Sequence, residues 1–180
     1  TTFSVFFFLS GTGNFLSYLR SDISEKEFKE KKRKLIHKIS KVLMAYYILA
    51  LISSLPDLLS TSTEMVLKLI KIFFFIKVPL YVEFLIPFIA AYFAVLFLRR
   101  FLKRIVSEAP YAIIISLSLF IIGTIGYGVK FPAELTFIKA ILFGNSDWYR
   151  FPLFQYGGLF ILGAYWGRIA STGEPYGQRG

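Results

Sequence analysis

Glu83 is the most informative side chain of this sequence for chemistry, because it is a carboxylate within an apolar stretch, residues 79–98. A charged group is costly inside a bilayer, so an ionisable residue within a membrane span is by default a hypothesis of function. Two other interpretations stay open for Glu83. Its carboxylate can reach the membrane interface, or it can pair with a lysine such as Lys77.

A second polar group lies where the last apolar stretch of the chain begins, and it consists of Asp147, Tyr149, Arg150 and Gln155. Trp148 and Tyr149 are residue types that commonly anchor a helix at the membrane interface, which is the more conventional interpretation. The alternative is that Asp147 and Arg150 bind a polar substrate at the mouth of a helix bundle. Under that alternative Gln155, which comes after Arg150 in the chain, lies inside the bundle.

Ser10 and Asn14 are the polar residues of the first apolar stretch, residues 3–19. Lipid does not favour small polar side chains, whereas close contact between helices does. We therefore expect this stretch to pack tightly against a neighbour or to line a cavity, with Ser10 and Asn14 in the polar wall.

The basic segment at residues 20–41 holds nine lysines and arginines against four acidic residues. The positive-inside rule alone explains such a segment beside an apolar span. Two further interpretations are attraction to anionic lipid headgroups and binding of the phosphates of a cofactor such as coenzyme A. For the cofactor interpretation we assign Lys31, Lys32, Arg33 and Lys38.

The composition argues against several other classes of protein. The sequence has no cysteine and one histidine, so it contains neither a thiolate metal site nor a histidine cluster. That histidine, His37, stands among lysines and is better explained as a solvated residue than as a catalytic base. The net charge of +10 follows the ends of apolar stretches, which favours membrane topology over nucleic-acid binding.

Charge-poor stretches alternate with short charged segments, although 56% of the residues are hydrophobic. This pattern predicts an all-α, polytopic membrane protein. We expect a membrane domain over 1–170 and a disordered tail over 171–180, with one or two interfacial helices, over 65–77 and 133–143. The expected spans are 3–19, 39–55, 79–98, 110–129 and 151–169.

Charge counts predict the orientation of these spans. The segment 99–108 has four basic residues against one acidic residue, whereas 56–79 and 130–150 each have three against two. The positive-inside rule therefore places 20–41, 99–108 and the C-terminal tail in the cytoplasm of a multi-pass protein of the cell membrane. A first span that starts outside also leads us to expect a further helix upstream.

Three segments together resemble the membrane acyltransferase superfamily, which comprises acyltransferase family 3 and the heparan-alpha-glucosaminide N-acetyltransferase-like proteins. Residues 6–11, FFFLSG, resemble an aromatic-rich helix of the family, and a basic segment follows them. Residues 80–87, LYVEFLIP, are similar to a second motif but have Glu83 where tryptophan is usual. Residues 151–168 resemble the family's late helix.

The resemblance implies transfer of an acyl group, often acetyl from acetyl-CoA, to a hydroxyl or amino acceptor such as a carbohydrate at the membrane. Acyl-CoA would be a co-substrate rather than a permanent cofactor, and no metal is implied. No residue here matches the family's catalytic histidine, so the catalytic residue stays unassigned. A transporter or flippase without acyl-transfer chemistry is the alternative from another class.

Overall fold

The computed structural model describes residues 2–59, 65–76, 78–79, 82–132, 135–145 and 149–172. Within these ranges every regular element is a helix, which confirms the predicted all-α class. The elements are α1 (Thr2–Asn14), the π-helical turn η1 (Phe15–Leu19), α2 (Glu25–Leu59), α3 (Met65–Phe73), α4 (Leu85–Phe97), α5 (Arg99–Val106), α6 (Ala109–Gly128), α7 (Thr136–Phe143) and α8 (Leu153–Thr172).

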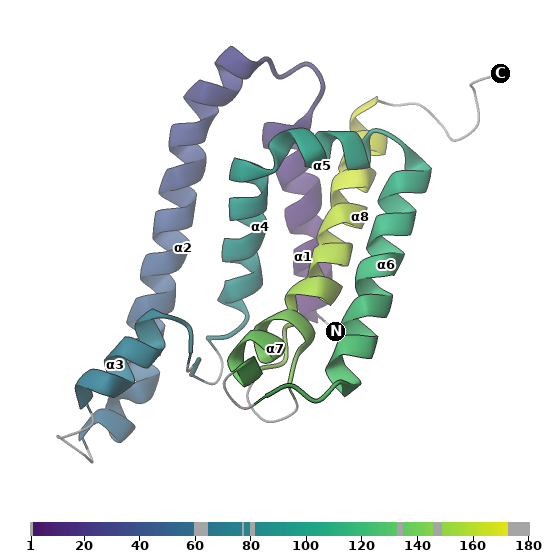
Figure 1. Cartoon of the computed structure of the whole chain (residues 1–180). Coiled ribbons are helices and arrows are strands. Elements are labelled where there is room, and N and C mark those ends of the chain that lie inside the picture. Colours follow the sequence, from purple (N-terminus) through teal and green to yellow (C-terminus); the bar gives the residue numbers. More distant parts are fainter. Residues whose placement is uncertain are drawn as a thin grey trace.

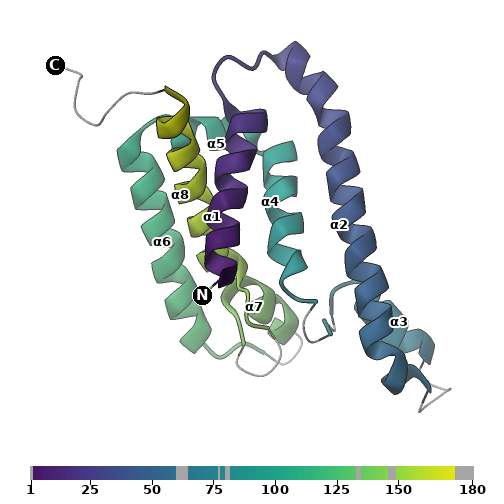
Figure 2. The ribbon, with the colours of Figure 1, turned by 180° about the vertical axis from the view of Figure 1, so that it is seen from behind.

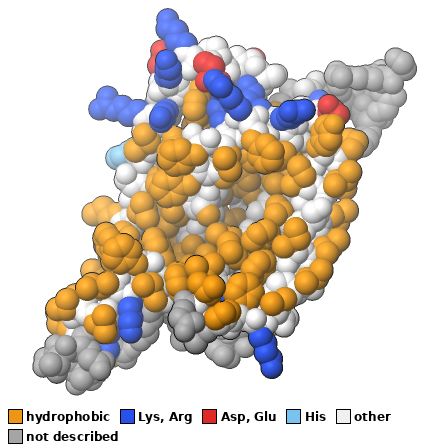
Figure 3. Space-filling view, in the orientation of Figure 1, with side chains coloured by type: hydrophobic (Ala, Val, Ile, Leu, Met, Phe, Trp, Pro, Cys, Tyr) orange, Lys and Arg blue, Asp and Glu red, His pale blue; other side chains and the backbone are white. Residues whose placement is uncertain are grey.

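The helices α1, α2, α4, α6 and α8 run roughly side by side and form an open bundle (Figures 1 and 2). α1 and α6 both pack against α8, whereas α2 packs along α4 on the outside. α5 lies across one end of the bundle, beside the start of α2, and α7 lies at the other end. We call the end at α5 the basic end, because lysines and arginines gather there in Figure 3. We call the opposite end the α7 end.

Two described helices are long and apolar enough to cross a membrane: α2, over Glu25–Pro56, and α6. The number of possible spans rises to three if α4 and α5, which meet at a bend of 95°, are counted together as one broken span. This is fewer than the five spans predicted. The predicted spans 3–19 and 151–169 do form helices, but the first is short (Phe3–Leu19), and α8 is diluted by glycines, Gln155 and Arg168.

Most of the basic segment 20–41 is helical, because α2 starts at Glu25 and runs through its remaining residues. Ser24 and Glu27 form a capping box at the start of this helix. Ser24 N–H donates to Glu27 Oε2 over 2.9 Å, and Glu27 N–H donates to Ser24 Oγ over 3.2 Å. Lysine and glutamate are good helix formers, so the same residues extend the apolar helix that follows.

Two other predicted boundaries are wrong. Pro56 does not end the second span, since α2 continues to Leu59 with Pro56 inside its final turns. The third span begins at Leu85 rather than at residue 79, because Val82–Phe84 form a turn. Its basic end, Arg99–Val106, is a helix turned away from α4 instead of a loop.

The closest helix pair is α1 with α8, and glycines make it possible. A Cβ on Gly11 would collide with the backbone oxygen of Phe160, and one on Gly163 would collide with the backbone oxygen of Phe8. Thr12 Oγ1 also donates to Gly163 O over 2.9 Å. The tight packing expected of residues 10–14 and of Gly163 is therefore confirmed.

α3 and α7 occupy the positions of the two predicted interfacial segments, 65–77 and 133–143. The C-terminal turn of α3 is tied to α2 by two tyrosines: Tyr46 Oη donates to Ile72 O over 3.3 Å and Tyr47 Oη to Phe73 O over 3.2 Å. At the C-terminus, α8 ends at Thr172, two residues into the predicted tail. Residues 173–180 lie outside the described residues.

Candidate functional site

Backbone hydrogen bonds join the described residues of the loop between α7 and α8. It starts at Gly144, whose φ of 90° favours glycine. Asn145 N–H then donates to Tyr149 O over 2.8 Å, and Tyr149 N–H donates back to Asn145 O over 3.4 Å. These bonds close the loop and fix Tyr149 and Arg150 immediately before α8.

Glu83 is buried beside this loop, with 3% of its surface exposed. Its Oε2 accepts a hydrogen bond from the backbone N–H of Arg150 over 3.3 Å. The carboxylate is thus enclosed by protein rather than by water, and Lys77 lies outside the described residues. Glu83 therefore joins the turn before α4 to the loop before α8, two segments that are distant in sequence.

A cavity of about 370 Å³ opens next to Arg150 at the α7 end. Three of the predicted substrate residues, Tyr149, Arg150 and Gln155, line it together. Glu83 is one hydrogen bond away, through Arg150. The remaining described lining residues are Thr124, Tyr127, Phe143, Gly144, Asn145 and Pro152.

Thr124, Tyr127 and Asn145 were not identified from the sequence as site residues. Thr124 and Tyr127 stand three apart on α6, which places them on one face of that helix. This spacing alone could not mark them, because it does not show which face of an apolar helix meets a cavity.

Tyr149 is fully buried, yet its hydroxyl makes no hydrogen bond among the described residues. Its ring belongs to a buried cluster with Tyr46, Val82 and Ala140, which draws on α2, α7 and the turn before α4. A buried hydroxyl normally has a partner, and one without it calls for an explanation, such as a ligand. The interpretation of Tyr149 as an interfacial anchor stays a prediction.

Ser10 and Asn14 are not part of this cavity. Phe3 packs on Phe151 at the α7 end, with ring centroids 5.0 Å apart, whereas Asn14 lies about 16 Å further along the helix. Asn14 Nδ2 donates to Ser10 O over 2.8 Å, so the two residues bond to each other. Asp147, the remaining predicted substrate residue, lies outside the described residues.

A second, apolar cavity of about 180 Å³ lies between α1, α4, α5 and α8. Pro87, Ala90, Ala91 and Ala94 line it from α4. Their spacing of three and four residues gives α4 one face of small side chains. Phe7, Leu102, Leu153, Tyr156, Gly157, Phe160 and Ile161 complete the lining.

The four predicted coenzyme A residues lie on α2. Lys32, Arg33 and Lys38 are exposed and Lys31 is half-buried, as expected for a helix facing water at the basic end. The Lys38 ammonium sits 5.5 Å from the centroid of the Tyr18 ring. His37 is exposed as well, in agreement with the solvated interpretation.

Arg99 is a buried residue that the sequence analysis took only as a topological signal. It is 4% exposed, and its guanidinium lies 4.3 Å from the centroid of the Phe28 ring. Its Nε donates to Tyr18 O over 3.0 Å, and its Nη2 donates to Ile23 O over 2.8 Å. Arg99 thereby holds η1 and the start of α2 against α5, and the local sequence gives no sign that it differs from Arg100.

Across the described residues, no three side chains of His, Cys, Asp or Glu gather in a way that would hold a metal ion. No protein-family model, curated protein or solved structure matches this chain. The function therefore has to be argued from the residues and cavities themselves.

Proposed function

We propose that this chain is a membrane-embedded acyltransferase that moves an acyl group from acyl-CoA to a carbohydrate or a similar hydroxyl or amino acceptor. The observation that carries the proposal is the polar site at the α7 end. There, three residues chosen from the sequence, Tyr149, Arg150 and Gln155, line one cavity. A fourth, Glu83, accepts a hydrogen bond from the backbone N–H of Arg150. The resemblance to the membrane acyltransferase superfamily supplies the reaction class.

Both cavities border α8, whose C-terminal end lies at the basic end. Gln155 lines the polar cavity, and Leu153, Tyr156, Gly157, Phe160 and Ile161 line the apolar one. Arg168 lies at the basic end, about 20 Å from Gln155 along the helix axis. An acyl-CoA held by the basic surface of α2, at Lys31, Lys32, Arg33 and Lys38, would send its thioester arm through the apolar space towards the acceptor.

The residues of the polar site have the chemistry that acyl transfer needs. An acceptor hydroxyl or amine attacks the thioester carbonyl, the new C–O or C–N bond forms, and the C–S bond breaks as CoA leaves as a thiol. Glu83 is the carboxylate available to take up the acceptor's proton. The Tyr149 hydroxyl and the Gln155 amide are donors for the oxyanion that develops on the carbonyl.

The other carboxylates whose side chains the structure describes, Asp22, Glu25, Glu27, Glu30 and Glu108, lie near the start of α2 or directly after α5, at the basic end. Among the described side chains Glu83 is therefore the carboxylate nearest to the polar site. This argues for Glu83 as the base within this part of the chain.

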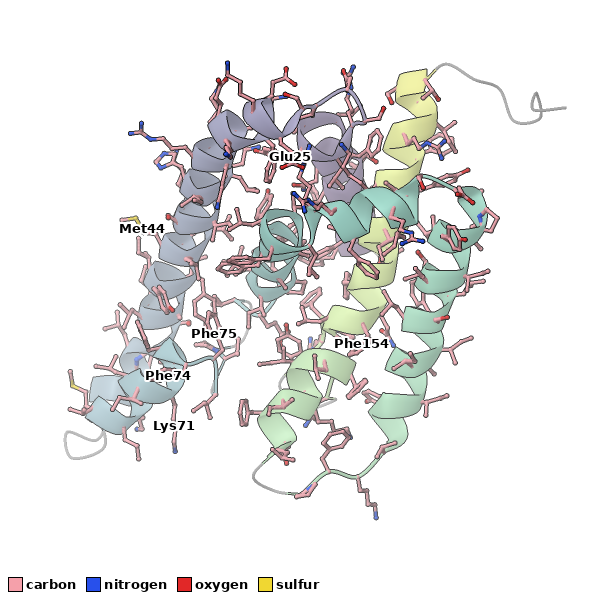
Figure 4. All side chains as sticks on the ribbon, turned by 45° about the horizontal axis from the view of Figure 1, so that its top comes forward. Glu25, Met44, Lys71, Phe74, Phe75 and Phe154 are labelled. Atoms are coloured by element: carbon pink, nitrogen blue, oxygen red, sulfur yellow. The ribbon has the colours of Figure 1, made fainter. Side chains whose placement is uncertain are left out.

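We further propose that all five long helical stretches enter the bilayer: α1 with η1, α2, α4, α6 and α8. Their side-by-side arrangement and the many exposed apolar side chains support this placement, among them Met44, which is 64% exposed on the outer face of α2 (Figure 4). The positive-inside rule then puts the basic end in the cytoplasm and the α7 end outside.

The test is a transfer assay with the full chain in lipid nanodiscs. Purified protein is given acetyl-CoA with and without a panel of mono- and oligosaccharides, and release of free CoA thiol is followed. Acceptor-dependent release that is lost in Glu83→Gln supports the proposal. Absence of acceptor-dependent release across the panel would overturn it.

A transporter or flippase is the second candidate, favoured by the bend between α4 and α5. These helices meet at 95° at Leu98, and broken helices are frequent at transporter binding sites. The discriminating experiment measures uptake of labelled sugars or scrambling of labelled lipids in proteoliposomes. Uptake or scrambling without CoA release would favour this candidate over the enzyme.

A further inference from the structure

A third cavity, of about 290 Å³, lies at the basic end between η1, the loop that follows it, α5 and the end of α8. Three cationic residues line it, one from each wall: Arg20, Lys103 and Arg168. None of them belongs to the group on α2 that the sequence suggested for coenzyme A. The other described lining residues are Phe15, Leu19, Ser21, Asp22, Val106, Ser107, Ser171 and Thr172.

The charges in this cavity are only partly compensated. Arg20 is paired with Asp22, to which its Nε and Nη2 donate over 3.0 and 2.6 Å. Lys103 and Arg168, in contrast, have no carboxylate within ion-pair distance among the described residues. The cavity therefore presents two positive charges that lack an anionic partner in this part of the chain.

Arg168 is also positioned rather than free to swing. Its Nη1 donates to the backbone oxygen of Val106 over 3.3 Å, and the other guanidinium N–H groups have no partner among the described residues. Lys103 and Arg168 are both half-buried, and Phe15, Leu19 and Val106 form an apolar wall beside them. Such a wall excludes water and strengthens the attraction between these cations and an anion.

From this arrangement we infer that the cavity binds a phosphate group, with Lys103 and Arg168 as its ligands and Arg20 at the rim. Arginine binds phosphate through paired N–H donors and lysine binds it as a point charge. The phosphate belongs either to the headgroup of an anionic lipid in the adjacent leaflet or to a soluble phosphate ester. The inference does not depend on acyl transfer, because binding is measured without turnover.

The experiment compares two probes on the full chain. In one arm, native mass spectrometry counts phosphatidylglycerol molecules retained by protein released from nanodiscs. In the other arm, calorimetry in uncharged detergent measures binding of inorganic pyrophosphate. Retention of lipid alone identifies a headgroup site, and binding of pyrophosphate identifies a site for soluble phosphates; either result supports the inference.

The decisive comparison is between two double variants that lose the same charge. Lys103→Gln with Arg168→Gln removes the cavity cations, whereas Lys29→Gln with Lys34→Gln removes two exposed cations of α2 that are not assigned to coenzyme A. We expect the first pair to weaken binding by about tenfold or more and the second by about twofold or less. Equal losses would show diffuse attraction to a basic surface and would overturn the inference, as would wild-type protein that binds neither probe.

A folding control is needed because Arg168 also bonds to Val106. Lys103→Glu alone makes no change to that bond and reverses one cavity charge. It should abolish binding of the probe while the protein keeps its helical circular dichroism. Unchanged binding by the folded Lys103→Glu variant would contradict the inference, whatever happens to the Arg168 variant.

Discussion

Arg99 Nη1 donates a hydrogen bond to Glu25 Oε1 over 2.8 Å and so joins the first residue of α5 to the first residue of α2. Glu25 lies where α2 begins, close to α5 (Figure 4). The same guanidinium also caps two backbone carbonyls, at Tyr18 and Ile23. One buried cation thus organises the loop that borders the basic cavity.

Arg99→Met should therefore destabilise the protein strongly. The substitution leaves two backbone carbonyl groups without their donor, at a cost of about 1–3 kcal/mol for each buried acceptor left unpaired. Arg100→Met is the matched control, since the Arg100 side chain is 89% exposed; it should change stability by about 0.5 kcal/mol or less. Thermal unfolding in detergent measures both, and equal midpoints would contradict the assigned role of Arg99.

Glu83 offers a test that separates structure from chemistry. Glu83→Gln keeps an oxygen for the Arg150 N–H but removes the carboxylate, so stability should hold while acyl transfer falls by about a hundredfold. Glu83→Ala also leaves that N–H unpaired, which should lower stability by about 1–3 kcal/mol. Activity in the Gln variant equal to that of the wild type would exclude Glu83 as the base.

Tyr149→Phe probes the hydroxyl that has no described partner. Because no hydrogen bond within the described structure is lost, unfolding should shift little. Transfer should fall by about tenfold or more if the hydroxyl binds substrate or oxyanion. Tyr111→Phe is the control, since Tyr111 is 48% exposed near the start of α6. A large loss of stability with unchanged transfer would make Tyr149 purely structural.

Two glycines of α1 should respond in opposite ways to the same change. Gly11→Ala places a methyl group against the backbone of α8 and should cost about 1–3 kcal/mol. Gly13 has nothing within 4 Å of an added Cβ, so Gly13→Ala should stabilise the helix by up to about 1 kcal/mol. Unfolding curves of the two variants check this, and similar shifts would rule out the close α1–α8 contact.

The apolar cavity predicts a change in acyl-chain preference. Ala94→Leu should fill part of the space between α4 and α8, so longer acyl groups should be transferred less while acetyl is retained. Phe93→Leu is the control, because Phe93 lies on the exposed side of α4. The measurement is the ratio of butyryl-CoA to acetyl-CoA use. An unchanged ratio would show that this cavity does not hold the acyl chain of the donor.

The sequence by itself determined the helical class, the capping box at Ser24 and the tight packing of the glycine-bearing helices. These features follow from local rules: apolar runs favour helices, a serine three residues before a glutamate caps one, and small residues permit close approach. It also singled out Glu83 and Tyr149, because a carboxylate or a polar aromatic residue beside an apolar span is conspicuous.

Only the tertiary structure decided which of these residues meet. Glu83 and Arg150 lie far apart in the chain and come together because the turn before α4 packs beside the loop before α8, a contact that no local rule specifies. The same holds for Arg99, which looks like Arg100 in sequence but is buried because α4 bends into α5 at Leu98. The composition of a segment determines which secondary structure it can form. Which side chains are buried, and which of them contact one another, is decided when distant segments pack together and exclude water.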